Sequence, residues 1–388
     1  MLSTLPQELV EKILLALDVE SLRACSLVSS VFLFPSQRLI FRSLIIYYAD
    51  IPKAQSLFAA APHLLGYVRD VRVGLEISLS AQNGLLASIL SSFHHLECLT
   101  IDGESVEWDD MTLPLQSAVH GLLTSASLHT LNLANIYNVP SSFILLALSF
   151  VARFGLYSVT VAEDSGSNLP DNFISLAPRM EHLILRAPYA EAAKPIVDLI
   201  LPDSRPSECL KKVKRLSLGA HRDIQAHSQR LIIASTSTLR HLQLRCGVFQ
   251  TALDLPHLPV LQIIELRLYL GYGVGLPPNL YTAIAALPTT TPAIEVLRLT
   301  FHGVPPDRED LARDRAGPFP LFDDTCAYRE RLPFLQRVHC HWWSDLPTDS
   351  DYEDYADFSP YMHEKFPGLW GSGVLEISAG GDKDDRFD

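Results

Sequence analysis

The sequence has no apolar run long enough to cross a membrane. Its longest apolar stretch, residues 143–152, spans about ten residues and includes Ser149, whereas a membrane-spanning helix needs about 20. The N-terminus also lacks a basic segment followed by an apolar run, so we expect no secretory signal. These absences predict a soluble protein of the cytoplasm, the nucleus or both, with no membrane partner.

Cysteine pairs with metal-binding or redox spacing are absent as well. The six cysteines, at positions 25, 98, 209, 246, 326 and 340, form no Cys-x-x-Cys pair. Several of them fall inside apolar patterns, which indicates reduced core residues in a reducing compartment.

Positive charge is scarce in this chain. The chain has 31 lysines and arginines and 44 acidic residues, so the formal net charge is −13. Because nucleic-acid recognition relies on a basic surface, we expect no nucleic-acid partner. Residues 345–388 carry twelve acidic and three basic residues, a net charge of −9, and hold most of the excess. The 48% hydrophobic content still predicts that most of the chain is packed.

Signatures of catalysis are also missing. There is no Gly-x-Ser-x-Gly elbow and no His-Glu-x-x-His pair. A glycine run at residues 271–275 would need a helix directly after it to cradle a phosphate, but Leu276-Pro277-Pro278 follows. We therefore expect no enzyme, no catalytic residue, no metal and no cofactor.

The segment 339–343, His-Cys-His-Trp-Trp, is the densest group of chemically versatile side chains. Strand alternation places His339 and His341 on one face and Cys340 on the other, so at most two of the three could bind one metal. We interpret His339, His341, Trp342 and Trp343 as a patch that binds a target protein, since exposed His and Trp supply strong contacts. The alternative, that the two tryptophans cap a core, stays open.

The first 44 residues predict three short helices. In the first, Leu9, Ile13 and Leu17 form one apolar stripe and Val10 with Leu14 a second, so more than half of its circumference is apolar. So short a segment with so much apolar surface is expected to bind a partner.

The caps of these helices are also visible in the sequence. Pro6 suits the first turn, Thr4 with Gln7 fits a capping box, and Asp18 can cap the second helix. That helix is predicted to carry Leu22, Cys25, Val28 and Phe32 on one side. Pro35 is predicted to open a third helix that ends near Phe41.

A degenerate repeat fills most of the remaining chain: an apolar residue, two variable ones, then two apolar residues separated by one. It recurs about every 30 residues, with spacings from 22 to 41. The ten copies span residues 68–73, 96–101, 128–133, 156–161, 180–185, 213–218, 239–244, 261–266, 294–299 and 335–340.

Each copy predicts one short strand, and the sequence between copies has helical spacing in several places. Alternating strands and helices favour an α/β fold with a parallel sheet and right-handed crossovers. Within a copy, alternate side chains enter the core. Leu131 and Leu133 should therefore be buried, with Thr130 and Asn132 facing solvent.

The N-terminal segment resembles an F-box, the adaptor-binding module of cullin-type ubiquitin ligases. The late tryptophan of many F-boxes is replaced here by Val31-Phe32-Leu33-Phe34, the form typical of fungal members. The matching residues are Leu5-Pro6, Glu8-Leu9, Ile13, Leu17, Leu22, Cys25, Leu27-Val28-Ser29, Phe32 and Leu39-Ile40-Phe41.

The repeats in turn resemble the irregular leucine-rich repeats of fungal F-box proteins, and Ala61 to Val71 resembles the segment that often begins them. The resemblance implies three regions: an F-box at 1–48, a leucine-rich-repeat solenoid with outer helices at 49–344, and an acidic segment at 345–388 that could be the last cap of the repeats.

This resemblance implies a substrate-recognition subunit of a cullin-type ligase. The F-box would bind a Skp-type adaptor and, through it, the cullin, while the repeats bind a target protein. Candidates for the adaptor contact are Leu5, Pro6, Leu9, Ile13, Leu14, Leu22 and Val28, although some of them must hold the helices together. Two alternatives are a repeat scaffold with a degenerate F-box and no ligase role, and an α/β enzyme whose N-terminal helices form a cap.

Overall fold

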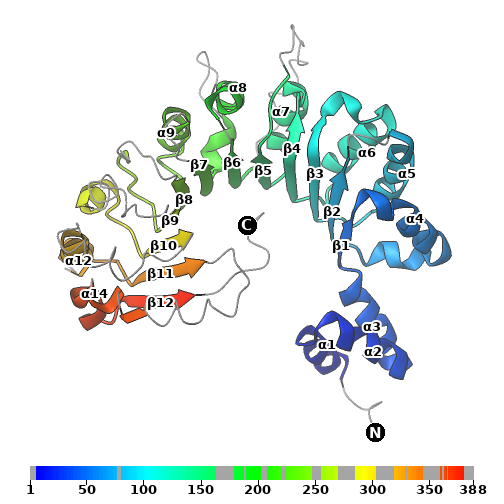
Figure 1. Ribbon diagram of the computed structural model, residues 1–388, viewed down its shortest axis with the longest axis horizontal. Coiled ribbons are helices and arrows are strands. Elements are labelled where there is room, and N and C mark those ends of the chain that lie inside the picture. Colours follow the sequence, from blue (N-terminus) through cyan, green and yellow to red (C-terminus); the bar gives the residue numbers. More distant parts are fainter. Residues whose placement is uncertain are drawn as a thin grey trace. The chain divides into compact units, whose positions relative to one another are not determined.

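The computed structural model has an α/β fold that divides into two compact units, Met1–Arg179 and Met180–Asp388 (Figure 1). Its described residues contain twelve strands, five in the first unit and seven in the second, and within each unit the neighbouring strands pair in parallel. The structure describes residues 6–76, 80–162, 179–187, 189–201, 208–219, 224–246, 255–269, 285–302, 319–327, 330–343, 359–360, 362–364 and 366–379.

Three helices open the first unit: α1 (Gln7–Leu15), α2 (Val19–Val28) and α3 (Ser30–Ile40). The Asp18 carboxylate accepts a hydrogen bond of 2.7 Å from the Ser21 backbone N–H, which confirms Asp18 as the cap of the second helix. Val10, Leu14 and Leu22 form the buried centre of the module. The predicted capping box lies partly outside the described residues, since Thr4 does.

The third helix differs from its prediction. It begins at Ser30, because the Ser29 side chain caps it by accepting a hydrogen bond from the Val31 N–H, and Pro35 lies inside it rather than at its start. Phe32 therefore belongs to the third helix and not the second. It still packs against the same core as Leu22 and Cys25.

Strands and helices then alternate through the rest of the first unit, and Figure 1 shows the helices α4 to α7 on one side of the strands. The strands pair in sequence order. The strands are β1 (Ser43–Ile46), β2 (Asp70–Leu75), β3 (Cys98–Glu107), β4 (Thr130–Tyr137) and β5 (Arg153–Tyr157). The helices are α4 (Ile51–Ala60), α5 (Ser80–Ser91), α6 (Leu113–Leu123) and α7 (Ser141–Phe150), with 3-10 turns at Tyr48–Asp50, Pro62–Gly66 and Trp108–Asp110.

The second unit repeats this arrangement, again with its described helices on one side of the strands (Figure 1). The strands are β6 (His182–Arg186), β7 (Arg215–Gly219), β8 (His241–Cys246), β9 (Ile263–Tyr269), β10 (Val296–His302), β11 (Arg337–Trp343) and β12 (Leu375–Ala379). The helices are α8 (Ala190–Ile200), α9 (Gln225–Ala234), α12 (Phe319–Ala327) and α14 (Pro367–Gly371), with a 3-10 turn at Glu208–Lys212.

The repeat accounts for the core of both units. In nine of the ten copies the last two apolar residues lie in a strand and face the helices, as Leu131 and Leu133 do with no exposed area. The register aligns these residues from strand to strand, so leucine stacks beside leucine along the sheet. Each such burial contributes about 1.5–3 kcal/mol relative to exposure.

The predicted frame of the fourth copy, residues 156–161, is wrong. The strand β5 ends at Tyr157, and Leu131 and Leu133 align with Phe154 and Leu156. The correct copy is therefore Val151-x-x-Phe154-x-Leu156, in which all three apolar residues are buried. The frame 156–161 also has apolar residues at the three required positions, so the pattern alone did not separate the two frames.

Two strands lie outside the ten copies. The strand β1 lies within the predicted segment 1–48 and pairs with β2, whereas β12 lies within the acidic segment 345–388 and pairs with β11. The helix α14 leads into β12 and is held by Asp323, whose carboxylate accepts hydrogen bonds from the N–H groups of Gly368 and Leu369 at 2.7 and 2.8 Å.

Candidate functional site

One face of the second unit's strands carries polar side chains. Residues that alternate with the core leucines point away from the helices, and no described helix of the unit lies on that side (Figure 1). We call this surface the arginine–histidine face. Its charged and imidazole side chains are those of His182, Arg186, Arg215, His241, Arg245, Glu265, Arg267, Arg298, His302, Arg337, His339, His341 and Glu376.

The composition of this face contrasts with that of the chain. The strands β6 to β12 contain six arginines, five histidines and two glutamates, whereas the chain as a whole has a net charge of −13. Among the residues of these strands, six positive charges therefore stand against two negative ones. A positively charged surface on an acidic protein attracts partners of the opposite charge.

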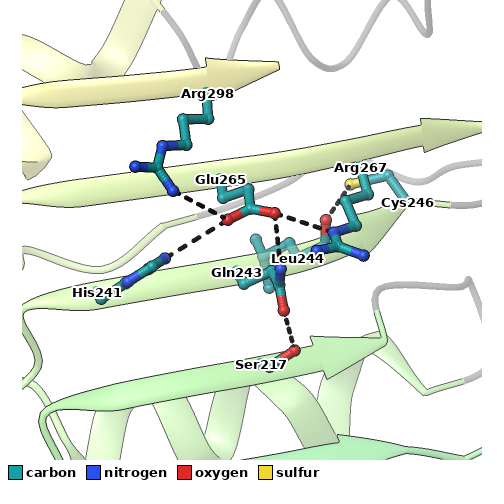
Figure 2. A network of polar contacts seen from close by, with 8 residues as sticks. All are labelled: Ser217, His241, Gln243, Leu244, Cys246, Glu265, Arg267 and Arg298. Carbon is teal, nitrogen blue, oxygen red and sulfur yellow. Dashed lines mark hydrogen bonds and ion pairs between the residues drawn. The ribbon is translucent and has the colours of Figure 1, made fainter. Parts of the chain in front are cut away.

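Glu265 on β9 is the centre of a polar network that joins residues of β7, β8, β9 and β10 (Figure 2). One carboxylate oxygen accepts hydrogen bonds from Gln243 Nε2 on β8 at 2.7 Å and from Arg267 Nε at 2.9 Å. The other lies 3.7 Å from His241 Nε2 and 4.0 Å from Arg298 Nη1 on β10. Ser217 on β7 donates a hydrogen bond to Gln243 and extends the row.

The network is buried although it lies on the helix-free side. The exposed fractions of Ser217, Gln243, Glu265 and Arg267 are all between 0 and 6%. A buried carboxylate costs free energy unless cations and hydrogen-bond donors surround it. Arg267 and Gln243 supply that compensation here, so the network fixes the relative positions of these strands.

The environment of Glu265 controls its ionisation. Burial alone would raise the pKa of its carboxyl group, but the nearby His241 imidazole, the charge of Arg267 and the hydrogen bonds from Gln243 and Arg267 hold that pKa well below its usual range. Burial also lowers the pKa of His241, and the positive charges of Arg215 and Arg298 act in the same direction, against Glu265. Glu265 is therefore ionised at neutral pH, with a neutral His241 beside it.

The predicted patch at 339–343 divides between the two faces of β11. His339 and His341 lie on the arginine–histidine face, and the Ser378 hydroxyl on β12 is 2.7 Å from His339 Nε2 and 2.8 Å from His341 Nδ1. Because a hydroxyl has one proton, it can donate to one ring while it accepts from the other. Burial, and then the neighbouring His341, lower the pKa of His339.

Trp342 does not fit the predicted target patch. It is 5% exposed on the helix side of the strand and stacks on Phe301, with ring centroids 6.4 Å apart and an interplanar angle of 14°. Strand alternation explains its burial, because Trp342 lies two residues after Cys340 and four after Val338, on the side of β11 that faces the core. The side chain of Trp343 lies outside the described residues.

Metal ligation finds no support in the part of the chain that the structure describes, which holds no group of three or more His, Cys, Asp or Glu residues able to bind one ion. Cys340 is fully buried among apolar side chains, and burial raises the pKa of its thiol. Burial likewise raises the pKa of Cys98 and Cys326 to about 12. These thiols stay protonated at neutral pH, which suits core residues.

The three-helix module carries a second candidate surface. Of the predicted adaptor residues, Pro6, Leu9, Ile13 and Val28 are exposed, with 46, 50 and 74% exposed area for the last three. Leu14 and Leu22 are 1 and 5% exposed and form the core of the module, so they are not available to a partner. Leu5 lies outside the described residues.

The exposed apolar side chains of this module extend beyond the predicted ones. They come from all three helices, and they lie between Leu9 in α1 and Phe34 in α3. The larger set is Leu9, Ile13, Leu15, Val19, Leu27, Val28, Val31 and Phe34. So many exposed apolar side chains on a small module are typical of an interaction site.

The sequence interpretation missed the Glu265 network, although its members share one position of the repeat. Ser217, Gln243, Glu265, Arg298 and His339 each lie between the last two apolar residues of their copy. The register places them side by side in adjacent strands. Comparing that position across copies would have revealed a polar row.

Comparisons with known proteins add no family to this description. No protein-family model and no curated protein matches the chain. Across the described residues, no helix has both the length and the apolar character needed to cross a membrane.

Proposed function

We propose that this protein is a substrate-recognition subunit of a cullin-type ubiquitin ligase. Its three-helix module would act as an F-box that binds a Skp-type adaptor, and its degenerate leucine-rich repeats would bind the target. The observation that carries the proposal is the combination of a complete core in the module with apolar side chains left exposed on all three of its helices.

The exposed stripe of α1 is the proposed centre of the adaptor contact. Val10 and Leu14 face the module's own core, whereas Leu9 and Ile13, on the adjacent stripe of the helix, remain exposed. Helices recognised in apolar grooves present residues at this spacing of i and i+4.

The end of α2 and the middle of α3 would complete the contact. Leu27 and Val28 are 87 and 74% exposed, and Phe34 is 58% exposed in the region where many F-boxes carry a tryptophan. Phe34 would supply the aromatic surface there, because Phe32 is turned toward the core. Large exposed aromatic residues are frequent anchors of protein interfaces.

The repeats would contribute target binding and nothing catalytic. Holding a target beside a ubiquitin-charged enzyme replaces a bimolecular encounter, and that effect alone can accelerate transfer greatly. The arginine–histidine face is the proposed target surface, with His339 and His341 as part of it. A target with acidic surface residues would suit its excess of positive charge.

Binding of the adaptor to two variants tests the proposal. Both variants carry the same substitution, isoleucine to aspartate, but at different positions in the chain. Ile13→Asp puts a charge on the proposed contact, and Ile233→Asp makes the same change on α9 at nearly the same exposure, 50 against 54%. We expect Ile13→Asp to weaken binding of a purified Skp-type adaptor at least about 30-fold, because hot-spot changes cost about 2 kcal/mol or more. Ile233→Asp should bind like the wild type.

Circular dichroism of both variants checks that the helices remain folded. Failure of the intact chain to bind the adaptor would overturn the ligase proposal and leave a repeat scaffold. Equal weakening by the two variants would place the contact elsewhere.

A further inference from the structure

The first strand of the first unit has apolar side chains on its helix-free side. Among the described strands β1 is first in the sheet order and pairs with β2 alone, so it is an edge strand. Ile46 and Tyr48 enter the core with 3% exposed area each. Ile45 and Tyr47 alternate with them and are 55 and 61% exposed. We call Ile45 and Tyr47 the apolar pair.

An exposed apolar pair is unusual on an edge strand. Edge strands of natural proteins commonly carry charged residues or proline, which prevent association with other chains, but β1 reads Ser-Leu-Ile-Ile. Exposed apolar side chains at such a place are typical of a surface that binds another protein. A tyrosine is also among the residues that most often anchor an interface.

The neighbouring strands offer no competing charge beside the apolar pair. Tyr47 lies next to Gly74 of β2, where an added Cβ would be 3.5 Å from the Tyr47 ring. The register aligns Ile45 with Arg72, but Arg72 forms an ion pair of 3.0 Å with Asp102 of β3. A partner over the apolar pair would therefore meet a glycine and an ion pair that is already neutralised.

The wider surroundings of the apolar pair are negatively charged. The sequence has no lysine or arginine between Val73 and Ala152, but it has seven acidic residues there. A partner that covers the apolar pair is therefore expected to be basic, because complementary charge favours association. Five of the acidic residues are exposed and lie in the carboxyl-terminal half of β3 or just beyond the ends of β2 and β3: Glu76, Glu104, Glu107, Asp109 and Asp110.

Strand geometry sets the spacing that a partner must match. Glu76 lies two residues beyond Gly74, about 6.7 Å, and β2 is about 4.8 Å from β1, so Glu76 is about 8 Å from Tyr47. Glu104 lies two residues beyond Asp102, which aligns with Gly74. In an extended segment, residues i and i+2 point to the same side about 6.8 Å apart. An apolar residue over Tyr47 would therefore place a long basic side chain, two positions later, within reach of these glutamates.

We infer that the helix-free side of β1 to β3 binds an extended, basic segment of a partner protein. Apolar residues of the segment cover Ile45 and Tyr47, and its lysines or arginines lie beside Glu76 and Glu104. The apolar contact anchors the segment, and the charges set its orientation and speed its association. The inference concerns a different surface from the arginine–histidine face and does not rest on adaptor binding by the three-helix module.

Fluorescence anisotropy with the full-length chain and a labelled peptide tests the inference. The probe is a nine-residue peptide in which serines alternate with two leucines and then two lysines, so that these four residues share one side when it is extended. In a comparison peptide both lysines are replaced by glutamate. We expect the lysine peptide to bind at least about tenfold more tightly at about 50 mM salt, and this ratio to fall severalfold at about 300 mM.

A matched pair of variants tests the apolar anchor. Tyr47→Ala should weaken the lysine peptide at least about fivefold, because truncation of an aromatic anchor removes a central contact. Tyr189→Ala, at the start of α8, truncates another exposed tyrosine and should bind like the wild type. Hydrogen exchange of the β1 and β2 peptides checks that the first unit remains folded in Tyr47→Ala.

A second matched pair tests the charges without touching the apolar pair. Glu76→Gln combined with Glu104→Gln should weaken the lysine peptide about fivefold at about 50 mM salt. Glu97→Gln combined with Glu181→Gln removes the same charge from exposed positions just before β3 and β6 and should leave binding unchanged.

Three results would each overturn the inference. The first is binding of the lysine peptide by the wild type that is absent or no tighter than that of the glutamate peptide. The second is an effect of Tyr47→Ala no larger than that of Tyr189→Ala. The third is equal weakening by the two pairs of glutamate substitutions.

Discussion

Replacing Glu265 by glutamine would keep the size of the side chain and remove only its charge. The oxygen that accepts from Gln243 Nε2 and Arg267 Nε can remain an amide oxygen, so both hydrogen bonds can persist in neutral form. The amide nitrogen would take the place of the oxygen that faces His241 and Arg298. The variant therefore isolates what the negative charge contributes.

The expected loss follows from the contacts of the carboxylate. Hydrogen bonds to a charged group contribute about 1.5–3 kcal/mol against about 0.5–1.5 for neutral ones, so two of them lose roughly 2 kcal/mol. Arg267 is 6% exposed at its side chain and would lose a counter-charge 2.9 Å away, which adds to the cost. We expect Glu265→Gln to lower the free energy of unfolding of this region by about 3 kcal/mol at pH 7.

The pH dependence has a definite sign. The pKa of Glu265 is held well below its ordinary value of 4.5 in the folded protein, so its contribution is fully present above that value. As the pH falls below 4.5, the unfolded chain takes up a proton that the folded chain does not, and stability is lost. The difference between wild type and Glu265→Gln should therefore be constant above about pH 5.5 and shrink below about pH 4.5.

A chain of many repeats need not unfold in one step, so the assay must read this region alone. Urea titration followed by pulsed hydrogen exchange of the peptides from β8 to β10 does so. Glu376→Gln is the control, because it removes an exposed partner of Arg337 on the same face, 3.0 Å away, and should cost less than about 1 kcal/mol. A loss below about 1 kcal/mol for Glu265→Gln, or a difference that does not shrink in acid, would refute a stabilising carboxylate.

Two further predictions concern packing. Gly155→Ala should destabilise the first unit by about 1–3 kcal/mol, because the added Cβ would overlap Asn132 Oδ1, whereas Gly121→Ala, with open space around it, should be neutral or stabilise by up to about 1 kcal/mol. Hydrogen exchange of the β4 and β5 peptides measures the loss of stability in Gly155→Ala. An equal change of stability in Gly155→Ala and Gly121→Ala would contradict this prediction. Leu14→Ala should cost about 2–5 kcal/mol in the three-helix module and the neighbouring Leu15→Ala, 63% exposed, well under 1 kcal/mol. Limited proteolysis of the module separates the two, and a reversed order would mean that α1 is rotated.

Much of the fold could be predicted from the sequence because it rests on local periodicity. An apolar residue at every second position, as at Leu242 and Leu244, defines which side of a strand is buried whatever packs against it. The same holds for Asp18, whose carboxylate caps a helix through residues three positions away. Copies of the strand pattern then predicted an α/β fold with parallel pairing.

Prediction was incomplete where two local solutions were equally good. The α1 sequence offers two apolar stripes, and only contact with the other helices shows that Leu14 enters the core while Ile13 does not. Residues 151–161 likewise contain two frames of the repeat. Pairing with β4 selects the one with Phe154 and Leu156.

The burial of polar side chains on the helix-free side of the strands could be seen only in the tertiary structure, for a different reason. Asn132 was expected in solvent, and alternation did place it on the helix-free side, yet it is 2% exposed and donates a hydrogen bond to Thr100 on the neighbouring strand. Glu265 and Gln243 are 22 residues apart in the chain. Their contact exists because the parallel register brings equivalent repeat positions together.

The sequence by itself therefore determined the strand-and-helix alternation, the core leucines and the presence of an apolar N-terminal module, since each depends on residues within a few positions of one another. Only the tertiary structure decided which apolar residues of that module stay exposed and which polar residues form a buried network. Those properties depend on what packs against a side chain, and between paired strands such as β8 with β9 or β10 with β11 that neighbour is one strand away in space and 22 or 41 residues away along the chain.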